Sequence, residues 1–200
     1  MCEVDDVSAS TSVKHLTSGN SRAPGVVGLT EDPDPYCNAM EENAKTYSIT
    51  ARLDEQLSLE KSGPNMIALL RGAKTREDLE QGMTNMTNGK DFATFIRASF
   101  HGWRNAYYGT TDAPKTFQYI FGNPLVAETM AKHDMFTALN VPLRLLVTEK
   151  ADRSGTQLVY LQPSTIVAVP VDGEVNEDLK AAAEALDAKV EKLIRTVTSP

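Results

Sequence analysis

Apolar and polar residues alternate along several short segments, the pattern of strands with one buried face. Segments 46–53, 91–100, 115–121 and 156–162 show it. The expected common faces are Tyr47, Ile49, Ala51 and Leu53 in the first; Phe92, Thr94, Ile96, Ala98 and Phe100 in the second; and Phe117, Tyr119 and Phe121 in the third.

Two further apolar segments complete the predicted strands. Residues 142–149, PLRLLVTE, form a strand that the turn KADRSG joins to 156–162 as a hairpin. Residues 65–72, NMIALLRG, are short enough to be either a buried strand or a helical turn. We favour a strand, because a helix start follows directly.

Cap residues mark the predicted helices. Thr75 and Asp78 form a capping box, and the helix that follows ends at Asn88-Gly89. Asn123 and Pro124 begin a helix over 124–133, as an N-cap followed by a proline at the first helical position. The final helix begins after Asn176 and carries an apolar stripe, which favours packing on a sheet over a short coiled coil: Leu179, Leu186, Val190, Leu193 and Val197.

These elements predict an α+β fold. A four- to five-stranded, mainly antiparallel sheet has helices packed on one face, giving a two-layer sandwich. Residues 1–45 are rich in Ser, Thr, Asp, Asn, Pro and Gly, so we expect a polar, flexible arm there. Residues 46–200 then form a single α+β domain.

Composition narrows the partners. The net charge of −7 weighs against nucleic acid and against anionic membranes, which both attract clustered Lys and Arg. The acidic N-terminus does not resemble a signal peptide, and Cys2 and Cys37 lack metal-ligand spacing, so we expect a cytoplasmic protein with reduced thiols. We predict no metal site and no cofactor, since nucleotide-binding and zinc-binding motifs are absent from the sequence.

The segment after residue 100 concentrates polar and aromatic side chains. We predict that it forms a loop and that His101 transfers protons, contacts a ligand or braces the fold. Trp103, Tyr107, Tyr108 and Tyr119 are expected to line an apolar cleft, with Arg104 available for a carboxylate. Asn123 is explained by helix capping, and it could also donate a hydrogen bond to the ligand.

The order of several short motifs resembles one family. A strand ending at His101 precedes Ala106, Gly109 and Thr116, and then come the motifs FGNP (121–124), VPLRLLVTE (141–149) and YLQP (160–163). From about residue 66 to 197 the chain is similar to the domain of unknown function 302 family. This resemblance implies a compact α/β sandwich, often a dimer, and implies little chemistry. About 65 residues at the front have no counterpart in that family.

Three functions remain open. The first is a small-ligand-binding domain whose pocket near His101 takes an apolar or carboxylated molecule. The second is a cofactor-independent acid-base enzyme, an isomerase, cyclase or lyase, that uses His101. The third is a homodimeric interaction scaffold whose acidic arm recruits a partner.

Overall fold

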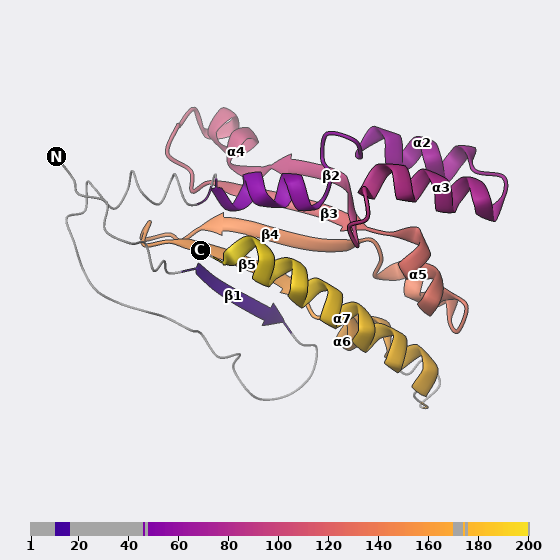
Figure 1. Ribbon diagram of the computed structural model, residues 1–200. Coiled ribbons are helices and arrows are strands. Elements are labelled where there is room, and N and C mark those ends of the chain that lie inside the picture. Colours follow the sequence, from indigo (N-terminus) through magenta and orange to yellow (C-terminus); the bar gives the residue numbers. More distant parts are fainter. Residues whose placement is uncertain (1–10, 17–45, 47, 170–173, 175, 200) are drawn as a thin grey trace.

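A five-stranded sheet forms the centre of the molecule (Figure 1), seen here in a computed structural model that describes residues 11–16, 46, 48–169, 174 and 176–199. In chain order the elements are β1 (Thr11–Leu16), a helix over residues 48–56, α2 (Pro64–Gly72), α3 (Arg76–Thr87), β2 (Ala93–Ser99), α4 (Phe100–Tyr108), β3 (Thr116–Gly122), α5 (Pro124–Ala131), the 3-10 helix η1 (Met135–Leu139), β4 (Leu143–Glu149), β5 (Thr156–Leu161), α6 (Pro163–Val167) and α7 (Glu177–Thr198).

The strand order is β1-β5-β4-β3-β2. The β2-β3, β3-β4 and β4-β5 pairs are antiparallel, and β1 pairs with β5 in parallel. The predicted mainly antiparallel sheet is therefore confirmed. Residues 11–16, which belong to the predicted polar arm, form β1, and the rest of the predicted 1–45 arm lies outside the described residues.

One face of the sheet carries the main core. Alternate residues of β3, β4 and β5 are buried there, as the two-residue period of a strand requires. The 48–56 helix and α7 cover this face, and all five stripe residues predicted for the final helix are buried. The opposite face bears partly exposed side chains, among them Gln118, Ile120, Leu146 and Val159. The predicted two-layer α+β fold is confirmed.

Two predicted strands are helices. Thr46, Ile49, Thr50, Leu53 and Leu57 are buried, which is a helical spacing, whereas the alternation proposed for 46–53 would require the exposed Ala51 to be buried. Ile49 and Leu53 lie four residues apart, which fits one helical turn and also two full periods of strand alternation, so a short window satisfied both periods.

The predicted strand 65–72 is helix α2. Pro64 occupies its first turn, where the missing N–H costs no hydrogen bond, and Met66 is its one fully buried residue. In 91–100 the strand prediction was correct, and the proposed buried face holds for Phe92 and Thr94 but is wrong from Ile96 onwards. A register shift between Thr94 and Ile96 moves Ile96 to the exposed face.

The predicted polar-aromatic loop after residue 100 is helix α4. Ser99 accepts a hydrogen bond from the Gly102 N–H at 3.2 Å, and Gly109 ends the helix with a left-handed backbone at φ 63°. Both caps are visible in the sequence. A loop was predicted instead because polar and aromatic side chains are concentrated in this segment.

The capping predictions for the other helices are confirmed. Thr75 and Asp78 form the capping box of α3, and Asn88 ends that helix in the left-handed conformation. Asn123 and Asn176 cap α5 and α7 through their side chains. Local hydrogen-bonding chemistry therefore fixed these helix boundaries.

Candidate functional site

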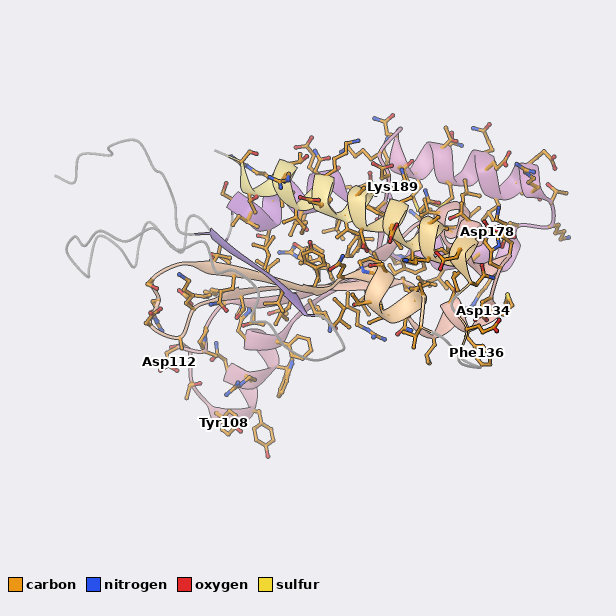
Figure 2. All side chains as sticks on the ribbon, turned by 90° about the horizontal axis from the view of Figure 1, so that it is seen from below. Tyr108, Asp112, Asp134, Phe136, Asp178 and Lys189 are labelled. Carbon is orange, nitrogen blue, oxygen red and sulfur yellow. The ribbon has the colours of Figure 1, made fainter. Side chains whose placement is uncertain are left out.

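Three aromatic side chains of α4 are largely exposed. Trp103 is 55% exposed and Tyr107 is 78% exposed, and Tyr108 is exposed as well. In Figure 2 Tyr108 lies at the outer end of α4, on the side of the sheet opposite Lys189 of α7. The guanidinium of Arg104 lies 5.9 Å from the centre of the Tyr108 ring, so its contact is within the same helix. The predicted convergence of these rings on a shared cleft was wrong.

The His101 side chain hydrogen-bonds to the backbone at the start of β3. Its Nδ1 atom lies 3.0 Å from both the N–H and the carbonyl oxygen of Thr116, so it accepts from the first or donates to the second, according to its tautomer. The ring meets the edge of Phe117, with centroids 4.9 Å apart, and Ser99 Oγ lies 3.2 Å from Nδ1. Among the hydrogen bonds of the described residues, none joins this imidazole to a carboxylate. The geometry supports a brace, and proton transfer by His101 stays a prediction.

Tyr119 belongs to a partly buried polar cluster beneath the 48–56 helix. Its hydroxyl donates to Asp54 Oδ1 at 2.8 Å, and Arg97 Nη1 lies 3.2 Å from Asp54 Oδ2. The Arg97 guanidinium also lies 4.6 Å from the centre of the Phe117 ring. Tyr119 is fully buried on the helix-covered face and does not join Trp103 in a pocket.

Burial sets the electrostatics of this cluster. Desolvation raises the pKa of Asp54, while the Tyr119 hydrogen bond and the charge of Arg97 act in the opposite direction. Desolvation, with the Asp54 hydrogen bond, also raises the pKa of Tyr119 well above its usual range. Asp54 and Arg97 were not among the predicted site residues, because they lie far apart along the chain and carry no shared motif.

Both polar atoms of the Asn123 side-chain amide form hydrogen bonds with backbone groups. Oδ1 accepts from the Leu125 N–H at 2.9 Å, and Nδ2 donates to the Asp91 carbonyl oxygen at 3.1 Å. The predicted cap is confirmed. The side chain also ties the start of α5 to the segment before β2, which leaves few free lone pairs or protons for a ligand.

A cavity of about 170 Å³ lies beside Asn123, at the end of β3 away from His101; we call it the α5 cavity. Six steps along β3 separate Thr116 from Gly122, about 20 Å at the usual rise per residue. The walls come from α2, α5, α7 and the ends of β2, β3 and β4, and no charged side chain contributes to them: Leu70, Phe92, Phe95, Gly122, Asn123, Pro124, Val126, Ala127, Met130, Val141, Pro142, Leu143 and Leu186. Asn123 is the one predicted site residue among them.

A comparison with protein-family models identifies the family of this chain. The model of the domain of unknown function DUF302 matches residues 73–196. The chain belongs to this family. The match confirms the resemblance found in the sequence, and residues 11–16 and 48–56 lie before the matched DUF302 segment.

A solved structure adds one relative. The uncharacterized conserved DUF302 protein from Bacillus stearothermophilus is 12% identical, and the alignment covers 62% of this chain and 91% of that one with a TM-score of 0.46. No curated protein matches the chain significantly.

Two of the motifs that carried the family resemblance meet at the α5 cavity. The FGNP motif supplies Gly122, Asn123 and Pro124, and the start of VPLRLLVTE supplies Val141, Pro142 and Leu143. The sequence showed each motif, but the contact between them depends on the antiparallel pairing of β3 with β4. The spacing of the two motifs along the chain therefore could not predict the cavity.

Metal ligands do not gather in the described part of the chain, where no three His, Cys, Asp or Glu side chains are placed to share an ion. None of the helices described is both long enough and apolar enough to cross a bilayer.

Proposed function

We propose that this DUF302 domain binds a compact, uncharged apolar molecule in the α5 cavity. The observation that carries the proposal is the cavity itself, about 170 Å³ with a largely hydrocarbon lining. An apolar protein cavity of about 150 Å³ admits benzene, so a single ring or a short branched chain matches the size.

The lining favours a neutral ligand over a carboxylated one. No Lys, Arg or His lines the cavity, and both ends of the Asn123 amide already have backbone partners. A carboxylate moved into this site would lose its hydration without gaining a cation, which is strongly unfavourable. Of the two ligand classes considered from the sequence, the apolar one fits this cavity.

The test is titration calorimetry with toluene and with benzoate. We expect heat from toluene and none from benzoate. Ala127→Leu fills the cavity from α5 and should weaken toluene binding at least about tenfold, whereas Glu128→Leu, exposed on the same helix, should leave it unchanged. Circular dichroism checks that both variants fold, and Val126→Phe offers a second way to fill the site.

Trp103 fluorescence separates this cavity from the pocket first predicted near His101. The α4 end lies about 20 Å from the cavity along β3. Toluene bound in the α5 cavity should therefore leave Trp103 emission unchanged. A change in Trp103 emission that saturates with the calorimetric signal would place the ligand at α4 and contradict the proposal.

Self-association is a second candidate, favoured by the sheet face opposite α7. Ile96 and Leu161 are exposed there, and Ile120, Leu146 and Val159 are partly exposed beside them. A second copy of the chain could cover this face in a symmetric dimer. Sedimentation equilibrium tests it: a dimer that Ile96→Lys converts to monomer supports the candidate, and a monomeric wild type contradicts it.

The acid-base enzyme that uses His101 remains the other alternative. It requires that His101→Ala keep the fold and abolish turnover. The scaffold that recruits a partner through the acidic arm depends on residues outside the described ranges.

A further inference from the structure

We infer that Leu70, on the hairpin of α2 and α3, sets the upper size of the molecule that the α5 cavity accepts. The inference rests on the proposed function and adds to it a residue that determines ligand specificity. It follows from how the walls of the cavity are held.

The walls belong to two separate hydrophobic clusters. Met130, Leu143 and Leu186 are buried members of the main core. The hairpin instead packs around its own small core of Met66, Met83 and Met86 with Ala93 of β2, and Phe95 packs against that core. The cavity therefore lies along the boundary between the two clusters.

The hairpin is itself closely packed. A methyl group added at Gly82 of α3 would overlap the Leu69 side chain of α2, so the two helices touch without a gap. The capping box at Thr75 fixes the turn between them. The backbone of Leu70 is consequently held in place by its neighbours, and the reach of its side chain decides where the wall lies.

Leu70 differs from the other wall residues in exposure. It is 41% exposed, whereas each of the others is buried or intermediate. It belongs to neither buried cluster. Shortening Leu70 therefore enlarges the cavity towards solvent without removing atoms from a core, which shortening Met130 or Leu186 would do.

Alkylbenzenes of increasing length measure the limit: benzene, toluene, ethylbenzene, propylbenzene and butylbenzene. Leu70→Ala removes about three carbon atoms from the wall, so the longest probe that binds should grow by up to about three carbons. Each methylene newly accommodated should improve affinity about fourfold. Leu70→Phe should shift the limit towards benzene.

Ile67→Ala is the matched control. Ile67 lies one turn earlier on α2 and is 36% exposed, and it does not line the cavity. Its replacement should leave the size limit where it is in the wild type. Titration calorimetry of the full chain with each probe gives the measurement.

The outcomes separate the two claims. A limit that moves with Leu70 and stays fixed with Ile67 supports the inference. Probes that bind the wild type and are blocked by Ala127→Leu, but show one size limit in all Leu70 and Ile67 variants, overturn the role of Leu70 and leave the binding function standing. A folded wild type that binds no probe overturns both.

Discussion

The two ends of β3 differ in the residue types they carry and in the structure found there. At the start of β3, α4 brings together the single Trp, a His and two Tyr residues, yet the structure uses them as a brace and as exposed surface. At the other end, ordinary Val, Ala, Met, Leu and Pro residues line a cavity.

Residue rarity was therefore a poor guide to the site. A side chain can act on a ligand only where several elements converge around it, and α4 is a short helix at the sheet margin, on the side away from α7 (Figure 2). The opposite end is where α2, α5, α7 and three strand ends meet. Convergence of elements, more than chemical character, distinguishes the two ends.

The largest expected effect contrasts the rarest residue with an ordinary one. Met130→Ala should lower the free energy of unfolding by about 2–4 kcal/mol, because Met130 is fully buried beside the cavity. Trp103→Ala at the α4 end should cost no more than about 1 kcal/mol, since its ring is half exposed. Urea unfolding followed by circular dichroism measures both, and equal costs would contradict the contrast.

Asp54→Ala tests the partly buried cluster of Asp54, Arg97 and Tyr119 near the middle of β3. The change removes the carboxylate that pairs with Arg97 and leaves the Tyr119 hydroxyl only its longer hydrogen bond to the Thr50 carbonyl oxygen, at 3.4 Å, so it should cost about 2–3 kcal/mol. Glu55→Ala removes an exposed carboxylate from the next position and should cost less than about 0.5 kcal/mol. The same unfolding experiment compares them. A cost for Asp54→Ala as small as that for its neighbour would show that the cluster does not hold the 48–56 helix on the sheet.

His101→Ala should be milder, at about 1–2 kcal/mol. It removes the hydrogen bond to the Thr116 backbone and the contact with Phe117. Because the α5 cavity lies at the other end of β3, toluene affinity should stay at the wild-type value. Weaker toluene binding in a folded His101→Ala variant would mean that the two ends are coupled.

The smallest effect is a difference in the pH dependence of stability. Desolvation raises the Asp54 pKa, so over the interval above the ordinary value of 3.8 the native state keeps a proton that the unfolded chain has lost, and stability falls as pH rises. The Lys189 hydrogen bond, reinforced by charge and by Lys192, lowers the Asp91 pKa, so the stability from that pair is present above the unfolded pKa and is lost as pH falls through the native pKa.

Asp54→Asn and Asp91→Asn should therefore change the pH profile in opposite directions. The stability of wild type minus Asp54→Asn should decrease from pH 3 to pH 6, and that of wild type minus Asp91→Asn should increase. Urea unfolding at several pH values provides both differences. Parallel profiles for the two variants would refute the assigned causes of these shifts.

The confirmed predictions share a local cause. Thr75 with Asp78, Asn123 with Pro124, and Asn176 each satisfy free N–H groups within a few residues, so a short window contains all the information. The strands 115–121, 142–149 and 156–162 were recognisable because each has one face on the core and one face open, which produces clean alternation.

The wrong predictions of secondary structure and strand face have two causes. A short window of sequence can fit both the helical and the strand period, and the pairing with a neighbouring strand can decide which side chains are buried. Ile49 and Leu53 fit a strand face as well as a helix face, and the turn-by-turn burial in the fold selected the helix. The face of Ile96 was reversed by a register shift that exists only in the pairing of β2 with β3.

Patterns along the chain predicted the α+β class, the starts of α3, α5 and α7, four of the strands and the family, because capping, alternation and motif order are properties of neighbouring residues. Tertiary structure alone decided the parallel placement of β1, the pairing of Asp54 with Arg97 and Tyr119, and the position of the α5 cavity. Each of these joins segments that are distant along the chain, and their meeting is fixed by strand register and by helix packing on the sheet. A cavity is the space that such packing leaves, and no residue encodes it alone.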